Sequence, residues 1–266
     1  MTRIDREMWA RNTAVEVHDY NADWFNQQYN KYQDYYDSAF LYGRRQIDFH
    51  FGHIIEKLDK KSRILDLGCC TGEQIEELLG DGFEVVGIEP SKNMRQYAES
   101  KLPPGTVKDG SILNIPFPDN YFDFVYAIEV LRYLNYNDNV TGMKEIYRVL
   151  RPGGIFFGTF VNRYAADGFA IITNIRKIAG RYSGKAQPCH VEFETPEKLI
   201  NTLGFIGFQE VEIHGAMIAF LRIIYKINNK LGRVCAKILE PYDKSLSDNS
   251  RFRYIAGHLV GIAKKM

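Results

Sequence analysis

The sequence predicts an α/β fold in which helices cover both faces of a mainly parallel sheet. From about residue 61, short apolar runs of strand length alternate with segments of helical period, which is typical of such sheets. Of the 266 residues, 45% are apolar and 25% are charged, as in an ordinary globular domain. The first strand-like run ends in a glycine turn, where a ligand can approach the backbone.

The first 60 residues differ from the rest, because they are predicted to form helices rich in aromatic side chains. The residues Tyr20, Trp24, Tyr29, Tyr32 and Tyr36 recur at intervals of three to five. This spacing places them roughly on one helix face, which is either buried core or part of a lid. A second helix is expected over 40–58. We therefore expect a helical N-terminal cap over 1–60 and one catalytic or binding domain over 61–266.

Each later element has its own signal. Strands are expected at 63–67, 84–88, 106–109, 122–128, 155–160, 208–213 and 254–263. Helices are expected at 72–79, 91–101, 138–150, 195–203 and 215–240. Ser91 is suited to cap the second of these helices, and Pro152 with two glycines ends the third. Stretches at about 163–194 and 215–250 break the alternation and are expected to be insertions.

Composition excludes several classes of protein. Lys plus Arg is 34 and Asp plus Glu is 33, so no global positive field exists to hold a polyanion, and nucleic acid is not expected as a partner. The four cysteines show neither zinc spacing nor a disulfide framework, so no metal site is expected. Neither a signal peptide nor an apolar run of about 18 residues is visible, which favours a cytoplasmic protein.

The strongest chemical signal is the turn from Asp66 to Gly72. Its glycines and the following helix N-terminus offer free backbone N–H groups to a ligand. Glu89 ends the second strand, where a carboxylate can accept hydrogen bonds from both hydroxyls of a ribose. The G-x-G-x-x-G pattern that wraps a pyrophosphate is absent, and Asp66 suits a cationic ligand such as an ammonium. These features favour S-adenosylmethionine over NAD.

With this turn, the chain resembles the class I S-adenosylmethionine-dependent methyltransferases of the type 11, small-molecule kind, whose first motif is usually D-x-G-x-G-x-G. Further segments match that family in order at 88–94, 115–123, 127–134 and 145–154. The resemblance covers about residues 45–215. It implies a Rossmann-like fold with a mainly parallel seven-stranded sheet. It also implies S-adenosylmethionine as cofactor and S-adenosylhomocysteine as product.

The resemblance further implies which residues meet the cofactor. Those expected are Asp66, Gly68 and Gly72 at the methionyl end, with Cys69 in the same turn, Glu89 at the ribose, Pro90, Met94, Ser111 and Ile112 at the adenine, and Ile128 and Glu129 beside the sulfonium. Two positions depart from the family. Cys70 replaces the middle glycine and must adopt a negative φ or strain the turn. Ser111 replaces the usual Asp, so adenine recognition would depend more on backbone groups.

The sequence says less about the methyl acceptor. A sulfonium methyl group is already activated, so alignment alone contributes roughly 7–11 kcal/mol and no shared catalytic triad is needed. We expect a small-molecule acceptor, methylated on O, N or C. Enzymes that methylate the amino groups of nucleic-acid bases usually carry a characteristic loop after the fourth strand, and here that position reads Ala127-Ile-Glu-Val. Cys189 lies beyond the fifth strand, which is not where the nucleophile of a cytosine methyltransferase is expected. A tRNA methyltransferase and a non-catalytic cofactor-binding protein are weaker alternatives.

Four residues outside the motifs are candidates for the site. His190 follows the fifth strand in a region that commonly covers the substrate in this family, where it would act as a general base. The alternative is a loop histidine that bonds a backbone carbonyl. If the N-terminal segment is a lid, Tyr20 and Tyr29 would close the site. Arg44 would then reach the cofactor carboxylate.

One predicted helix also carries a basic stripe. Its cations are Arg222, Lys226, Lys230, Arg233 and Lys237. In one interpretation, the opposite apolar face packs on the domain and the basic face is simply solvated. In the other, the basic face meets an anionic substrate or a membrane, as in a peripheral enzyme that methylates a lipid or quinone.

Overall fold

The computed structural model describes residues 3–30, 34–166, 169, 173, 175, 190–218 and 220–266. The positions of Tyr32 and Cys189, and the side chain of Tyr29, lie outside the described part. Within that part, no helix is both long enough and apolar enough to cross a membrane.

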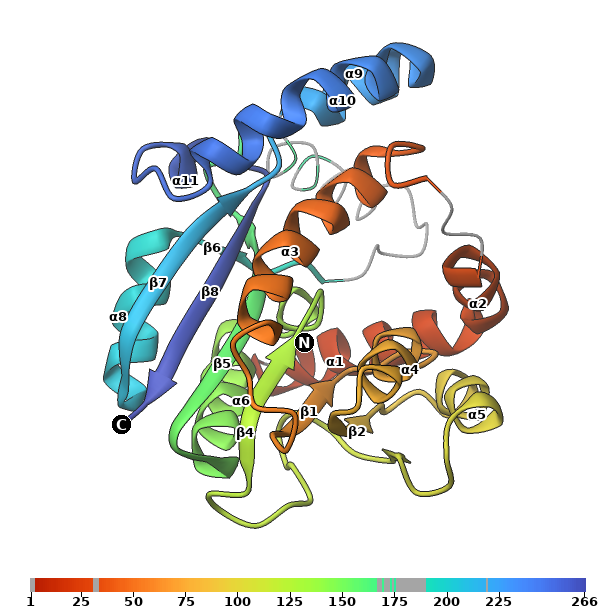
Figure 1. The fold of residues 1–266 in the computed structure, drawn as a ribbon, viewed down its shortest axis with the longest axis vertical. Coiled ribbons are helices and arrows are strands. Elements are labelled where there is room, and N and C mark those ends of the chain that lie inside the picture. Colours follow the sequence, from red (N-terminus) through yellow and green to blue (C-terminus); the bar gives the residue numbers. More distant parts are fainter. Residues whose placement is uncertain are drawn as a thin grey trace.

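A single mixed sheet forms the centre of the described structure (Figure 1). Its strands are β1 (Arg63–Leu67), β2 (Glu84–Ile88), β3 (Val107–Lys108), β4 (Phe122–Ala127), β5 (Leu150–Asn162), β6 (Phe193–Glu194), β7 (Phe208–Ala216) and β8 (His258–Lys265). Their order is β3-β2-β1-β4-β5-β8-β7, and the short β6 pairs with β5 beside this path. Among these strands only β8 runs in the opposite direction to the others, which confirms the predicted mainly parallel sheet.

Helices lie on both faces of the sheet, as predicted. They are α1 (Arg3–Tyr20), α2 (Ala22–Asn30), α3 (Ala39–Ile55), α4 (Glu73–Gly80), α5 (Lys92–Lys101), α6 (Tyr136–Val149), α8 (Pro196–Ile206), α9 (Phe220–Ile227), α10 (Asn229–Leu246) and α11 (Phe252–Ile255), with a 3-10 turn η1 (Leu131–Tyr133). Apolar residues of α3, α4 and α5 pack on one face of the sheet. Residues of α6 and α8 pack on the other. A third cluster joins α9, α10 and α11 to Tyr42 of α3.

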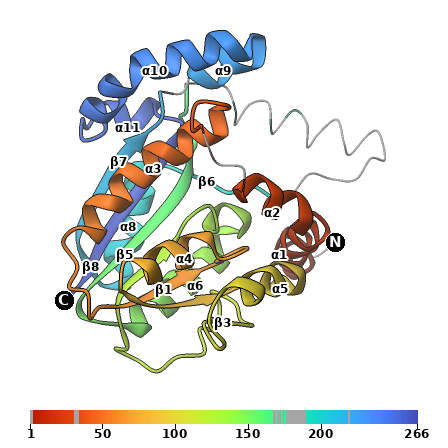
Figure 2. The ribbon, with the colours of Figure 1, turned by 45° about the vertical axis from the view of Figure 1, so that its right-hand side comes forward.

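The N-terminal helices occupy two different places (Figure 2). Helix α1 lies beside α5, where the Asp19 carboxylate accepts hydrogen bonds from the Ser91 hydroxyl at 2.7 Å and the Asn93 backbone N–H at 2.8 Å. Ser91 also caps α5 as predicted, since its hydroxyl accepts from the Met94 N–H. Helix α3 instead packs against β7, β8 and α10.

Two predicted elements are wrong in their boundaries. The helix expected over 215–240 is two helices, because β7 extends to Ala216 and the chain turns at Asn228. The Asn228 side chain accepts a hydrogen bond from the Leu231 N–H and so begins a new helix. The strand expected from 254 begins at His258, where it pairs with Ala216, and residues 252–255 form α11.

Candidate functional site

The candidate site lies at the carboxyl ends of β1 and β4. The strand order reverses between these strands, because the chain proceeds from β1 to β2 on one side and from β4 to β5 on the other. Such a switch point is where open α/β sheets bind ligands. Two cavities of about 520 and 220 Å³ meet there, and both are lined by Gly68, Cys70 and Ile128. Together they offer room for an elongated ligand that bends around the first turn.

Glu89 holds the turn after β1 against the end of β2. Its carboxylate accepts hydrogen bonds from the backbone N–H of Cys70 at 3.0 Å and of Ser91 at 2.8 Å. The Gly68 N–H donates to the Ile88 carbonyl at 2.8 Å and ties the turn to β2 a second time. Burial raises the pKa of Glu89, although the two backbone N–H groups oppose the shift. The carboxylate is thus oriented at the edge of the smaller cavity, which it also lines.

The turn requires left-handed backbone at three positions. Gly68, Cys70 and Gly72 have φ values of 75°, 54° and 85°. At Gly68 a Cβ atom would lie 2.5 Å from a methyl group of Val130, so only glycine fits there. Cys70 does not take the negative φ that would avoid strain, and left-handed backbone costs a non-glycine residue roughly 1–2 kcal/mol. Strain of this kind is often retained at ligand sites.

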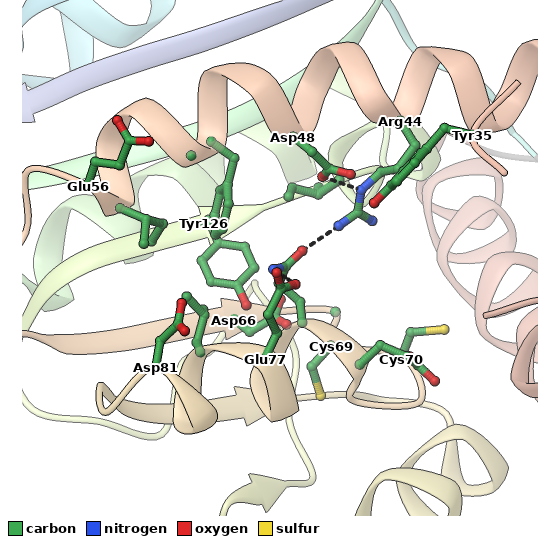
Figure 3. Close-up of a pocket in the computed structure, with 18 residues that line it drawn as sticks. Tyr35, Arg44, Asp48, Glu56, Asp66, Cys69, Cys70, Glu77, Asp81 and Tyr126 are labelled. Carbon is green, nitrogen blue, oxygen red and sulfur yellow. Dashed lines mark hydrogen bonds and ion pairs between the residues drawn. The ribbon is translucent and has the colours of Figure 1, made fainter. Parts of the chain in front are cut away.

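The larger cavity is acidic and is closed on one side by α3 (Figure 3). Burial raises the pKa of Asp66 to about 7, while the Tyr126 hydroxyl and the Arg44 guanidinium oppose that shift. Arg44 lines this cavity, where its guanidinium donates to Asp48 at 2.7 Å and to Gln74 at 2.6 Å. The site therefore holds one cation among several carboxylates, an arrangement suited to a ligand with both an ammonium and a carboxylate.

The smaller cavity gathers most of the remaining predicted residues. It is lined by Glu89, Pro90, Met94, Ser111, Ile112, Ile128 and Glu129. Helix α1 covers it with Ala14, Val15 and His18, and Phe25 follows from α2. The His18 ring lies 5.2 Å from that of Phe25, and burial lowers the pKa of His18. A largely apolar cavity with a carboxylate at its edge suits a nucleoside.

The lid residue Tyr20 is not where we expected it. Its side chain is 89% exposed at the end of α1 and does not line either cavity described here. His18 and Phe25 lie over the smaller cavity instead. The aromatic spacing indicated a helix face, but not which residues of that face meet the pocket. The side chain of Tyr29 belongs to the undescribed part, so its predicted role stays a prediction.

Glu129 is held firmly at the end of β4. Its backbone has a φ of 60°, and its N–H donates to the Thr159 hydroxyl at 2.7 Å. Burial by itself would raise its pKa, but the Arg132 guanidinium at 2.5 Å and then His258 outweigh burial and lower the pKa to about 2. Glu129 is thus a fixed anion at the rim of the smaller cavity.

His258 is the histidine that the structure brings to Glu129. Its Nδ1 atom lies 3.5 Å from the Glu129 carboxylate, and its Nε2 accepts from Arg222 at 3.1 Å. Burial lowers the pKa of His258 to about 4, although Glu129 opposes that shift. The neutral ring therefore carries its proton on Nδ1, facing Glu129. Sequence reasoning missed this pair, because 128 residues of chain lie between Glu129 and His258, which meet only when β4 and β8 both pair with β5.

The structure places the His190 ring beside Glu192. Its Nε2 atom lies 3.1 Å from the Glu192 carboxylate, and it is absent from the described lining of both cavities. The Glu192 backbone is tied to the Arg132 carbonyl. None of the described contacts of His190 is with Glu129, so the general-base role predicted for it stays a prediction.

The basic stripe is divided between two helices and does not act as one face. Arg222 points inward to His258, and Arg233 pairs with Asp34 at 2.6 Å. Lys226, Lys230 and Lys237 remain exposed. The apolar residues that we expected to be buried opposite the stripe are largely exposed. The interpretation as a packed apolar face with a solvated basic face is thus wrong for α10.

A separate cluster lies away from both cavities. Ligand-type atoms of His50, His214 and Asp248 lie within 4.8 Å of one another. His214 contacts Asp248 through Nδ1 at 2.7 Å and Glu212 through Nε2 at 3.3 Å. Cysteine and histidine spacing did not predict this cluster, because its members come from α3, β7 and the turn after α10. Both nitrogens of His214 already face carboxylates, so its geometry is that of a hydrogen-bonded cluster.

Comparison with known proteins supports one family. A family model described as a methyltransferase domain matches residues 65–158. The chain is 39% identical over 105 residues to a demethylmenaquinone methyltransferase of Geobacillus sp., covering 36% of this chain and 44% of that protein. It is 31% identical over 153 residues to an uncharacterized methyltransferase of Bacillus cytotoxicus, covering 54% and 71% respectively. The match spans about half the length of several of these curated relatives.

A solved structure supports the fold. An S-adenosylmethionine-dependent methyltransferase of Thermotoga maritima, described as a possible histamine N-methyltransferase, superposes with a TM-score of 0.57. It is 19% identical, and the match covers 91% of this chain and 96% of that one. At this identity the likeness concerns the fold alone.

Proposed function

The chain belongs to the S-adenosylmethionine-dependent methyltransferases, and from this we propose that it transfers a methyl group from S-adenosylmethionine to a small-molecule acceptor. One observation carries the proposal. The acidic cavity beside Asp66 and the apolar cavity beside Glu89 meet at Ile128, at the carboxyl end of β4. A ligand with a charged amino-acid end and a nucleoside end would present its middle at that junction.

The residues present fit this cofactor. The buried Asp66 carboxyl suits its ammonium, and Arg44 lies in the same cavity for its carboxylate. Each Glu89 oxygen accepts one backbone hydrogen bond and keeps a second lone pair for a ribose hydroxyl. Met94 is fully buried and lines the apolar cavity with Ile112, where an adenine ring would be sandwiched. When bound, the cofactor supplies a methyl group that is already activated on a sulfonium.

The protein's own contribution would then be alignment and exclusion of water. Helix α1 covers the apolar cavity, and Asp19 ties that helix to α5. Glu129 stays ionised near neutral pH because its pKa is about 2, so it is a poor general base there. Its fixed charge at the junction instead suits it to orient an acceptor that carries a hydrogen-bond donor or a positive charge.

Two experiments test this function. Isothermal calorimetry should show binding of S-adenosylmethionine and S-adenosylhomocysteine, with NAD as the negative control. Glu89→Ala should weaken that binding by roughly 1.5–3 kcal/mol, while the exposed Glu84→Ala on the same strand should not. A metabolite panel read out by released S-adenosylhomocysteine would then identify the acceptor. Binding of neither cofactor form by the intact protein would refute the proposal.

A lipid or quinone acceptor at a membrane is the second candidate. It is supported by the relative named demethylmenaquinone methyltransferase and by the exposed apolar side chains of α9 and α10. We also propose a reducing, cytoplasmic compartment and no nucleic-acid partner. The free thiols of Cys69, Cys70 and Cys235 support the compartment, and the net charge of +1 supports the absence of a polyanion.

A further inference from the structure

Helices α9 and α10 each present apolar side chains to the outside. The exposed fractions of these side chains run from 38% to 77%, and the residues are Phe220, Ile223, Ile227, Leu231, Val234, Ile238, Tyr242 and Leu246. Within each of the two helices the spacing of three or four residues is that of one helix face, and the two faces follow each other across the turn at Asn228. We call these residues the outer row. Both helices lie at the edge of the molecule, beyond α3 (Figures 1 and 2).

Buried polar contacts fix the rotation of α10 and so keep the outer row outside. Asp243 accepts hydrogen bonds from the Tyr42 hydroxyl and the Ile218 N–H, both at 2.9 Å. Glu240 accepts from Arg45 at 2.8 Å and from the Tyr36 hydroxyl. Turning the outer row inward would break these contacts and expose two acids where apolar residues now lie. The apolar face is therefore turned outward by specific interactions with α3.

The charges on these helices indicate which kind of surface the outer row would bind. Lys226 and Lys230 are exposed and adjoin the outer-row residues Ile227 and Leu231, whereas the Lys237 ammonium lies over the Tyr36 ring at 5.1 Å from its centroid. Among residues 220–246 the acids are Glu240 and Asp243, and both are buried on the inner side. The outer side of these two helices thus combines apolar residues with lysines and carries no carboxylate of its own, although Asp34 and Asp37 pair with Arg233 of α10. A second copy of this face would bring lysines against lysines, whereas an acidic headgroup layer complements both features.

We propose that the outer row of α9 and α10 binds the surface of an anionic lipid bilayer, with both helices lying in the plane of the interface. The apolar side chains would enter the boundary between headgroups and acyl chains, and the lysines would contact headgroup phosphates. This docking does not depend on methyl transfer.

The inner side of α9 connects this surface to the candidate site. Arg222 precedes the outer-row residue Ile223 and donates to His258, which faces Glu129 at the rim of the apolar cavity. Docking would therefore place the junction of the two cavities, where methyl transfer is proposed, close to the bilayer. This second step rests on the proposed function, and it implies an acceptor that is an amphipathic lipid with its reactive group near the headgroup level.

Co-sedimentation with vesicles tests the docking. The full chain should bind vesicles that contain phosphatidylglycerol at least tenfold more strongly than vesicles of phosphatidylcholine alone, and added salt should weaken the binding. Ile227→Gln with Leu231→Gln should reduce binding at least tenfold, and so should Lys226→Gln with Lys230→Gln. Matched controls are Phe205→Gln, an exposed apolar residue on α8, and Lys144→Gln, an exposed lysine on α6.

Three results would overturn the proposal. In the first, the parent protein does not bind vesicles that contain phosphatidylglycerol. In the second, the outer-row variants bind the vesicles as well as the control variants do. In the third, the parent protein is a dimer, and only the outer-row variants are monomers. Circular dichroism and calorimetry with S-adenosylmethionine on each variant separate these outcomes from misfolding. If the parent binds vesicles but not the cofactor, the proposed function fails while the docking surface stands.

Discussion

Asp66 of β1 and Tyr126 of β4 are register partners on adjacent parallel strands, and their side chains lie together in the acidic cavity (Figure 3). The pairing puts a buried carboxyl at the point where the strand order reverses. Because burial raises the pKa of Asp66 to about 7, this acid changes charge near neutral pH when no ligand is bound.

The first prediction follows from that pKa. A bound ammonium favours the ionised carboxylate, so affinity for S-adenosylmethionine should fall by up to tenfold per pH unit as the pH drops below about 7. Asp66→Asn should bind more weakly and lose this pH dependence, whereas Tyr126→Phe should keep it. Calorimetry on both sides of neutrality measures the effect. An Asp66→Asn variant with the parent's pH profile would assign the titration to another group.

The second prediction concerns the strained turn. Replacing Cys70 by glycine removes left-handed backbone strain, which stabilises the folded protein by about 1–2 kcal/mol. Glycine also loses more conformational entropy on folding, which destabilises the folded protein by about 0.5–1 kcal/mol. Cys70→Gly should therefore raise the free energy of unfolding by up to about 1.5 kcal/mol and retain cofactor binding. Cys70→Val, with a β-branched side chain at positive φ, should lose stability and affinity. Urea unfolding compares the two, and equal destabilisation by both would contradict the strain argument.

The third prediction tests the latch between α1 and α5. Asp19→Ala removes the acceptor for the Ser91 hydroxyl and the Asn93 N–H, so the helix over the apolar cavity should open more often. Cofactor dissociation measured by stopped flow should accelerate about three- to tenfold. Glu16→Ala, an exposed acid one turn earlier on α1, is the control. The hydrogen bond from the Asn93 N–H lowers the pKa of Asp19, so the latch should hold throughout the neutral range.

The fourth prediction separates two histidines. His258→Gln should lower kcat about tenfold, because Glu129 loses a partner at the junction, while cofactor affinity should barely change. His190→Ala should leave kcat within about twofold, since its ring contacts Glu192 outside both cavities. Steady-state kinetics with the identified acceptor give both values. A tenfold loss for His190→Ala instead would support the general-base role predicted from the sequence.

The fifth prediction is a dependence of stability on pH. The pKa of His258 is about 4 when folded and about 6.5 when unfolded, so between these values the unfolded chain binds more protons. Its contribution to stability is complete above about 6.5 and is lost as the pH falls towards about 4, by at most about 3 kcal/mol. His50, also with a pKa of about 4, acts in the same direction.

Asp66 opposes these two histidines in nearly the same range. Its folded pKa is raised, so the folded protein binds more protons between about 4 and 7 and gains stability on acidification there. The test is therefore to measure the free energy of unfolding of the parent and of His258→Gln by urea at several pH values and to compare the two at each pH. The difference should shrink as the pH falls through the window, and a constant difference would show that His258 does not titrate.

The sequence by itself determined the frame of the cofactor site. Short apolar runs, a serine cap and a glycine turn are local signals, and they placed β1, β2 and α5 within a residue or two. The motif residues from Asp66 to Glu129 meet in space because the carboxyl ends of adjacent parallel strands lie at one edge of a sheet.

The tertiary structure alone decided which histidine meets Glu129 and which face of α10 is buried. His258 reaches Glu129 because β8 pairs antiparallel with β5, a contact between distant segments that no local pattern encodes. A helical period shows that a helix has two faces, but not which of them faces the domain. In α10 the contacts of Asp243 with Tyr42 and of Glu240 with Arg45 determine which face is buried. Burying an acid without a hydrogen-bond partner is costly in free energy, so the face that carries these two acids is the one that packs against their partners.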